Sequence, residues 1–245
     1  MKIIYKRFIV TALMLSFLGL AAAMAVMLEI DGVKPVLAGV EVLPTFVIDA
    51  GHGGMDGGAV GVHKELEKDI NLSVATTLNE MLKAGGYKTI MVRSDDRSVH
   101  DLQYTSARQQ KVSDIKNRLK LAEETPNAIF VSIHQNLFGQ SSCNGAQIFY
   151  SKNNPQSEVL AEALRTQFKA LLMPENERAT KPAQKNLYIL YNATCPAVLA
   201  ECGFLSNANE AMLLSDSEYQ SKVAFTIYTG LMNYLQAEEP AIIDY

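Results

Sequence analysis

Two of the chain's four histidines follow, within a few residues, apolar runs that are typical of buried strands. His52 follows the run 46–48, and His134 follows the run 129–131. In α/β proteins the carboxyl ends of the strands line the crevice in which ligands bind. Two imidazoles delivered to one edge of a sheet therefore predict the beginning of a metal site.

Such a site needs a third protein ligand, because catalytic zinc sites combine three N or O donors from the protein with a water. The neighbouring candidates are Asp49, Asp56, His63, Glu65, Glu67 and Asp69. Geometry favours Glu67, since the first turn of the helix that follows the glycine-rich segment 50–61 starts beside His52. A carboxylate there also suits the positive end of the helix dipole. Glu65 stays open as the competing ligand.

A fourth candidate, Glu201, ends the apolar segment 196–200. A carboxylate at the exit of a buried strand either caps the next segment or faces the crevice. Facing the crevice beside a metal, it would act as the general base that takes a proton from water. We therefore interpret Glu201 as the catalytic carboxylate, distinct from the ligands.

The remaining polar residues near these positions have plainer interpretations. Asp49 is expected to be structural and to orient His52 or its loop, because a metal-bound histidine usually needs an acceptor for its second nitrogen. His63 and His100 lie in polar stretches and are expected to be ordinary surface residues.

Strands and helices must alternate to bring these residues together. Strands are predicted at 45–49, 88–92, 128–133, 146–150, 187–190 and 197–200, and helices at 65–84, 114–124, 155–172 and 215–235. This order predicts an α/β fold with a mostly parallel sheet of about six strands, helices on both faces and a single catalytic domain.

Capping patterns and polar stretches set the boundaries of these elements. Ser113 is expected to cap the helix at 114–124, Pro155 to occupy the first helical position, and Ser215 with Glu218 to form a capping box. The polar, aperiodic segment 94–112 is expected to be an exposed insertion, and 173–185 a loop.

The N-terminus has the pattern of an export segment. A positive beginning precedes an apolar stretch over 8–28, which is long enough to be a signal peptide or a membrane anchor. The predicted divisions are 1–28 for this segment, 29–44 for a linker, 45–235 for the catalytic domain and 236–245 for a flexible tail. We expect an exported protein that contacts the membrane only through the first segment.

Composition limits the classes of partner. A formal net charge of −4 and a pI of about 5.6 argue against a nucleic-acid partner, which would require a basic surface. The hydrophobic content of 48% is enough for a sizeable core. We interpret the three cysteines as small apolar residues rather than as nucleophiles or metal ligands; they are Cys143, Cys195 and Cys202.

Four ordered segments resemble the zinc-dependent N-acetylmuramoyl-L-alanine amidases of bacterial cell walls. They are VIDAGHGG at 47–54, EKDINL at 67–72, FVSIH at 130–134 and PAVLAECGFLSN at 196–207. The resemblance implies one zinc ion held by His52, Glu67 and His134, with Glu201 as the catalytic carboxylate. It also decides against Glu65, because the family's metal-binding glutamate directly precedes a lysine, as Glu67 does here.

The resemblance assigns structural roles to Arg93 and Arg118, which match family positions. Two departures could alter the substrate groove: Gln135 stands where the family usually has alanine, and the segment 94–112 is unusual. A lone catalytic domain with an export segment is most similar to the germination-specific amidases of spore-forming bacteria.

That narrower likeness implies spore-cortex peptidoglycan as the substrate, from which removal of the stem peptide leads to muramic-δ-lactam. It implies action at the outer face of the cytoplasmic membrane, in the cell wall or in the space around the forespore. The family resemblance as a whole implies an activator protein as a partner. The alternatives are another zinc peptidase of the cell wall such as a carboxypeptidase, a general cell-separation amidase, and a non-catalytic wall-binding protein.

Overall fold

The computed structural model describes residue 14 and residues 43–238. The predicted export segment and linker lie outside these residues except for Met14, Leu43 and Pro44, and most of the predicted tail lies outside them as well. Among the described residues, no helix is both long and apolar enough to cross a membrane.

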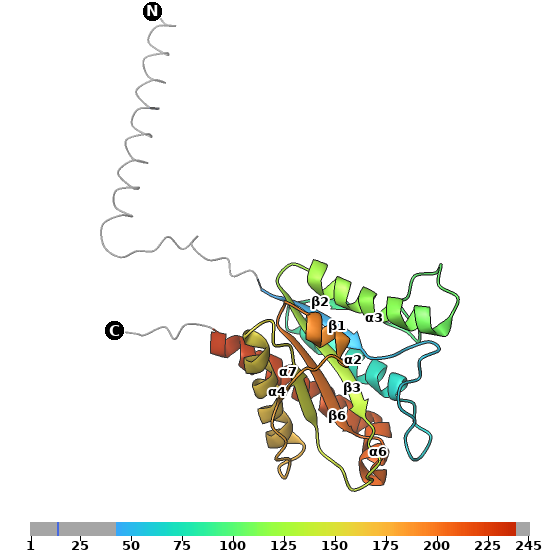
Figure 1. Cartoon of the computed structure of the whole chain (residues 1–245). Coiled ribbons are helices and arrows are strands. Elements are labelled where there is room, and N and C mark those ends of the chain that lie inside the picture. Colours follow the sequence, from blue (N-terminus) through green and yellow to red (C-terminus); the bar gives the residue numbers. More distant parts are fainter. Residues whose placement is uncertain (1–13, 15–42, 239–245) are drawn as a thin grey trace, which may run out of the picture. The chain divides into compact units, whose positions relative to one another are not determined.

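A six-stranded sheet with the order β2-β1-β3-β6-β4-β5 forms the centre of the domain (Figure 1). Its strands are β1 Thr45–Ala50, β2 Lys88–Met91, β3 Ala128–Asn136, β4 Gln147–Tyr150, β5 Lys181–Pro182 and β6 Ala197–Phe204. The helices are α2 Glu67–Ala84, α3 Ala107–Glu124, α4 Gln156–Leu171, α5 Tyr188–Asn192, α6 Ala208–Ser215 and α7 Ser217–Glu238.

The predicted α/β class is confirmed: β2, β1, β3 and β6 are parallel neighbours, and β5 is parallel to β4. Among the paired strands of the described sheet, only β4 and β6 are antiparallel. The chain between β3 and β4 contains no helix, and a parallel arrangement of those two strands would require a crossover connection. β4 therefore runs back against the direction of β3.

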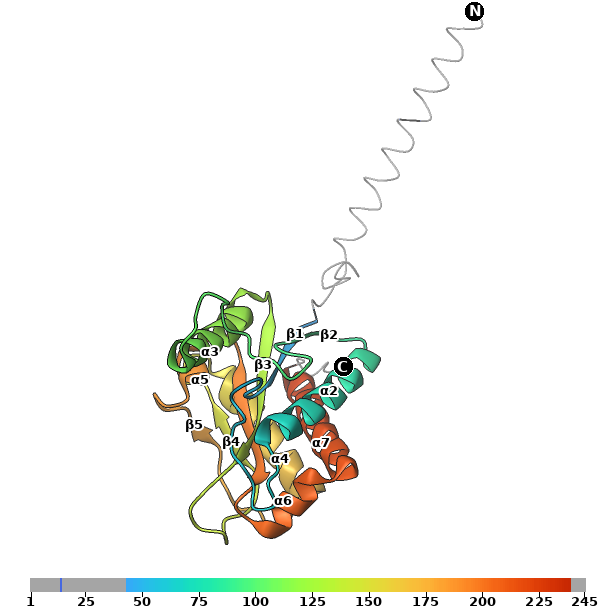
Figure 2. The ribbon, with the colours of Figure 1, turned by 90° about the vertical axis from the view of Figure 1, so that its right-hand side faces the viewer.

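Helices cover both faces of the sheet, as predicted (Figure 2). Successive residues of a strand point to opposite faces, so Phe46 and Ile48 of β1 pack in the core beneath α2, α4 and α7. Val47 between them packs in the second core, beneath α3 and α5, together with Phe130 and Leu199. The sheet is thus buried on both sides.

The predicted start of α3 is wrong. The helix begins at Ala107, where the Ser106 side chain accepts a hydrogen bond from the backbone N–H of Gln109 at 3.3 Å. Ser113, predicted to be the cap, lies buried within the helix, and its hydroxyl accepts from the backbone N–H of Asp101 at 3.0 Å. The first part of the predicted insertion remains a loop, and its last six residues are helical.

Other boundaries also differ from the prediction. The segment 187–190, predicted to be a strand, forms the N-cap and the first three residues of α5, since an apolar run this short does not distinguish strand from helix. Pro155 occupies the N-cap of α4 rather than its first helical position. The predicted capping box is absent from the described chain: Asp216, not Ser215, accepts from the backbone N–H of Tyr219, at 2.8 Å. The short helix α6 was not predicted.

Candidate metal centre

His52 lies in a sharp turn at the exit of β1, with a φ of 63°. The preceding residue, Gly51, leaves room for the other histidine, because a Cβ atom at Gly51 would lie 2.2 Å from the His134 ring. His134 lies near the end of β3, one strand away, so the parallel sheet delivers both imidazoles to the same edge. The two ring centroids are 4.9 Å apart.

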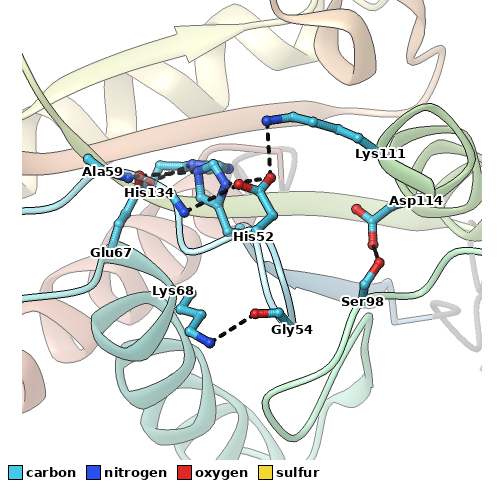
Figure 3. A network of polar contacts seen from close by, with 12 residues as sticks. His52, Gly54, Ala59, Glu67, Lys68, Ser98, Lys111, Asp114 and His134 are labelled. Atoms are coloured by element: carbon cyan, nitrogen blue, oxygen red, sulfur yellow. Dashed lines mark hydrogen bonds and ion pairs between the residues drawn. The ribbon is translucent and has the colours of Figure 1, made fainter. Parts of the chain in front are cut away.

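Glu67, the first residue of α2, lies between the two histidines (Figure 3). Its Oε2 is 3.1 Å from His52 Nε2, and its Oε1 is 2.9 Å from His134 Nδ1. One donor atom from each of the three residues lies within 4.8 Å of the others, so the three residues together could hold a metal ion. The structure thus brings together the three residues predicted as ligands.

Three further groups donate hydrogen bonds to the Glu67 carboxylate. The backbone N–H of Ala59 donates to Oε2 at 2.8 Å, and the backbone N–H of Gln135 donates to Oε1 at 3.1 Å. The Asn71 side chain also donates to Oε1, at 3.3 Å. Burial alone would raise the pKa of Glu67, but contacts with the two histidines outweigh it and hold this pKa far below its usual range. Glu67 is therefore a preorganised anion.

The second nitrogen of His52 bonds Asp56 rather than Asp49. His52 Nδ1 lies 3.0 Å from Asp56 Oδ2, which also pairs with Lys111 of α3 at 3.2 Å. Burial lowers the pKa of His52, but Asp56 and Glu67 outweigh it and raise this pKa to about 9. A carboxylate on the remote nitrogen orients the ring toward Glu67, which is how outer carboxylates fix metal-binding histidines.

Asp49 orients the loop indirectly, through Arg118. Its Oδ1 accepts from Arg118 Nη1 at 2.5 Å, and its Oδ2 accepts from the Ser132 hydroxyl at 2.6 Å. Arg118 in turn donates to the backbone carbonyls of Ala50, at 2.9 Å, and His52, at 2.6 Å. The expectation that Asp49 orients the loop of His52 is therefore met, with Arg118 as the intermediary.

Arg93 supports the same turn from the other side. It is fully buried and donates to the carbonyls of Ala50 at 2.8 Å, Gly51 at 3.0 Å and Lys68 at 2.8 Å. Backbone carbonyls that leave a strand in a sharp turn have no strand partners, and the two arginines satisfy them. This is the structural role that the resemblance assigned to Arg93 and Arg118.

The segment 94–106 is tied to the glycine-rich loop. Asp96 accepts from the backbone N–H of Gly54 at 2.8 Å and from Lys68 Nζ at 2.6 Å. Figure 3 shows that Lys68 Nζ also donates to the Gly54 carbonyl. An ammonium shared between the loop and Asp96 limits the freedom of the turn that carries His52. This segment therefore helps to shape the site.

The other predicted candidates lie apart from the cluster. Glu65 accepts from the backbone N–H of His63 at 3.0 Å, and His63 is an exposed residue whose Nε2 lies 3.3 Å from the Ala208 carbonyl. Asp69 is exposed. His100 bonds the Ser98 hydroxyl at 2.8 Å. None of these four side chains belongs to the described cluster of ligand atoms.

The prediction that the cysteines are buried packing residues holds for Cys202, whereas Cys195 is partly buried against the second core and Cys143 is partly buried outside both cores. All three are free thiols, and Cys202 is fully buried. Burial raises the pKa of the Cys202 thiol, and burial with the nearby Glu123 raises that of Cys195 to about 11. Thiols with raised pKa values are poor nucleophiles at neutral pH.

Glu201 lies on β6 directly beside His134. The two residues are register partners in the parallel β3–β6 pair, so their side chains lie on the same face of the sheet. Its Oε2 is buried and has no hydrogen-bond partner among the described residues. Burial, opposed by His134 and His52 and reinforced by Glu67, raises the pKa of Glu201 to about 7. A carboxyl group tuned to this range can both accept and return a proton near neutral pH.

A pocket of about 210 Å³ adjoins the two histidines. Its floor includes Ser132 and Leu199 of the sheet, and its walls come from Ile115 of α3 and from the segment 186–190. The lining combines apolar side chains such as Leu190 with charged ones such as Asp56 and Lys111. A bound molecule could therefore place an apolar part in this pocket and a polar group at the cluster.

The fold and the cluster together define a class: an α/β protein with two histidines and a glutamate at the carboxyl edge of its sheet, the donor set of metal-dependent hydrolases. Residues 46–233 match the N-acetylmuramoyl-L-alanine amidase family. The chain belongs to this family. It is an enzyme that hydrolyses the amide bond between N-acetylmuramic acid and L-alanine in peptidoglycan.

Individual relatives show how far the similarity extends. The chain is 36% identical over 189 residues to the germination-specific N-acetylmuramoyl-L-alanine amidase of Bacillus subtilis, covering 76% of this chain and 78% of that protein. The CwlD amidase of Clostridioides difficile, solved in complex with the GerS lipoprotein, matches with a TM-score of 0.76 and 39% identity over 80% of this chain and all of that one.

The catalytic domain of the amidase CwlV from Bacillus (Paenibacillus) polymyxa is a further structural neighbour. It matches with a TM-score of 0.64 and 33% identity, over 80% of this chain and all of that domain. The matched structures thus span essentially the whole described domain.

Proposed function

We propose that His52, Glu67 and His134 hold one catalytic zinc ion and that Glu201 is the general base. The observation that carries this proposal is the cluster itself, whose imidazole nitrogens lie 2.9 and 3.1 Å from the carboxylate oxygens. Tetrahedral ligands about 2.0–2.1 Å from zinc are about 3.4 Å from one another, so the donors need to part only slightly to admit the ion. The donor set leaves the fourth position open for catalysis.

Zinc, when bound, supplies a Lewis acid that polarises the scissile carbonyl and makes water more acidic. This chain's residues do the remaining work. The unpartnered oxygen of Glu201 takes the proton of the attacking water and passes it to the nitrogen of the leaving L-alanine. Asp56 holds His52 in the orientation that leaves its Nε2 free toward Glu67.

Replacing Glu67 by glutamine should cost most of the zinc affinity, whereas Glu65→Gln should bind zinc as the wild type does. The Glu67 carboxylate faces both histidines, and Glu65 only caps the turn at His63. Zinc content after dialysis, measured by atomic emission, separates the two variants. Equal zinc content in both would remove Glu67 from the ligand set.

Zinc affinity should increase with pH between about 6.5 and 9. His52 has a pKa of about 9 in the metal-free protein, and a protonated imidazole does not bind metal. Below that pKa the ion must displace one proton, so the association constant should rise about tenfold per pH unit and level off above it. Competition with a chelator at several pH values measures this slope. A flat profile would contradict the protonated state of His52.

The substrate we propose is spore-cortex peptidoglycan, cut by a protein exported from the cytoplasm. The similarity to a germination-specific amidase over most of both chains supports this substrate. The neighbour bound to a lipoprotein supports an activator protein as a partner. A germination role is also consistent with action at the outer face of the cytoplasmic membrane, in the cell wall or in the space around the forespore. Residues 1–28 would serve as the export segment.

Product analysis tests the bond and the substrate together. Cortex peptidoglycan treated with the enzyme should yield free stem peptides that begin with an L-alanine amino group, and the lactyl carboxyl should be freed on the glycan. Release of a C-terminal amino acid instead would identify a carboxypeptidase. Arg93 and Arg118 support the amidase instead, since both guanidinium groups are buried and already donate to backbone carbonyls.

The same assay also compares the rates of hydrolysis of cortex and vegetative peptidoglycan, and we expect the cortex to be hydrolysed faster. Equal rates on both substrates would favour a general cell-separation amidase. Absence of any product, with zinc bound and with extract of the source cells added, would favour a wall-binding protein.

A further inference from the structure

Gln135 is a polar residue of β3 whose side chain is buried. It directly follows His134 on β3, and successive strand residues point to opposite faces of the sheet. The His134 ring therefore reaches the cluster, whereas Gln135, only 3% exposed, faces α2 on the other side. Its side chain is not in the substrate groove, where the sequence suggested an effect.

A chain of hydrogen bonds joins Gln135 to the candidate metal ligand Glu67. Gln135 Nε2 donates to Asn71 Oδ1 at 3.1 Å. Asn71 Nδ2 then donates to Glu67 Oε1 and to the carbonyl of Gly51, both at 3.3 Å. Asn71 is fully buried, so its amide depends on these partners rather than on solvent.

We propose that Gln135 is a positioning residue of the metal site, acting through Asn71; the inference rests on the proposed zinc site. An asparagine amide has nearly the same shape in its two orientations, so its partners determine which one is adopted. The reversed amide would place Oδ1 against two acceptors, the Glu67 carboxylate and the Gly51 carbonyl. These two acceptors favour the observed orientation, and the Gln135 donor on Oδ1 holds the amide in it, with Nδ2 toward Glu67.

The glutamine is costly to the fold, which argues that it serves the site. Gln135 Oε1 is buried and has no hydrogen-bond partner among the described residues. The neighbouring Cys202 thiol is a weak donor that is directed to the Ala200 carbonyl at 3.5 Å. Against the larger effect of burial, its contact with the Gln135 amide lowers the pKa of the thiol, as expected where the amide is the donor. A buried carbonyl without a donor destabilises the native state, and an apolar side chain of similar size would avoid this loss.

The test is Gln135→Met, which conserves volume and removes both the donor and the unpaired oxygen. We expect the zinc dissociation constant, measured by competition with a chromophoric chelator, to rise tenfold or more, as for other outer-shell changes. The melting temperature of the metal-free protein should stay equal or rise. Zinc affinity within twofold of the wild type would overturn the proposal.

Gln220→Met is the matched control. Gln220 is also buried, but both ends of its amide are satisfied, by the Ser73 hydroxyl at 2.6 Å and the Leu214 carbonyl at 2.7 Å, away from the cluster. The control should lower the melting temperature and leave zinc affinity unchanged. If Gln220→Met loses as much zinc affinity as Gln135→Met, the loss follows from destabilisation of the fold in general, and the proposal is overturned.

A double variant tests the route through Asn71. If Gln135 acts only by orienting that amide, Asn71→Ala with Gln135→Met should bind zinc no more weakly than Asn71→Ala alone. If the double variant loses zinc affinity by the product of the factors for the two single variants, the route through Asn71 is overturned. Failure of the wild type itself to bind zinc is a different result, because it would overturn the proposed zinc site before any variant is compared.

Discussion

Glu201→Gln should reduce turnover on peptidoglycan by about 10²–10⁴-fold, the range typical of general acid–base groups, and leave zinc content near that of the wild type. The amide has the shape of the carboxylate but cannot accept the proton of water. Because Glu201 adjoins the cluster without belonging to it, the ligands should be unaffected. Steady-state rates with metal analysis of the same sample measure both quantities.

The pH profile adds an independent signature of Glu201. Burial raises its pKa to about 7 in the metal-free protein, and the charge of a nearby cation would lower it from there. The wild-type rate should therefore rise with pH as Glu201 ionises, somewhere between its ordinary value of 4.5 and about 7. This rise of the rate with pH should be absent in Glu201→Gln and present in the control variant Glu158→Gln, whose side chain is exposed. A Glu201→Gln rate within tenfold of the wild type would exclude Glu201 as the base.

Arg118→Met should destabilise the domain by about 3–5 kcal/mol, because it leaves the buried Asp49 carboxylate without its counter-charge. Arg118 and Asp49 are only 3% and 1% exposed, and their atoms lie 2.5 Å apart. The same change removes the donors to the Ala50 and His52 carbonyls, so zinc affinity should fall as well. Urea unfolding of the metal-free protein measures the first effect.

The control for charge loss is Arg165→Met. Arg165 pairs with Glu162 on the exposed face of α4, and exposed ion pairs contribute about 0–1 kcal/mol. Arg118→Lys should fall between the two variants, because a lysine keeps the charge but cannot bond several acceptors as a planar fork. A loss in Arg118→Met no larger than in Arg165→Met would contradict the role assigned to the buried pair.

Elements with a regular apolar pattern were predicted well. β1 and β2 match their predicted ranges to within one residue, and α2 ends at Ala84 as predicted. α3 is the contrast. Its buried residues are Ser113, Arg118 and Ala122, because the helix packs against the buried ion pair as well as against the apolar core. Its inner face is largely polar, so hydrophobic periodicity could not reveal its first turns.

For the site too, the residues that adjoin apolar strands were predicted most directly from the sequence. His52, His134 and Glu201 could be placed at one edge of the sheet because each follows or ends an apolar strand, and this information is local in the chain. Geometry favoured Glu67, but excluding Glu65 needed the family resemblance, because the predicted helix 65–84 placed both residues on its first turn; in the structure α2 begins at Glu67. The structure then placed Glu67 against both histidines.

The outer contacts of the site depended on tertiary structure. Asp56 rather than Asp49 bonds His52, and Gln135 faces α2 rather than the groove. These pairings join segments up to 64 residues apart, and they depend on where the loops and α2 settle against the sheet. Apolar periodicity determines which strands and helices form and what stands at their ends. Hydrogen bonds between distant polar groups form only when packing brings the groups together, and packing therefore decided how the site is held.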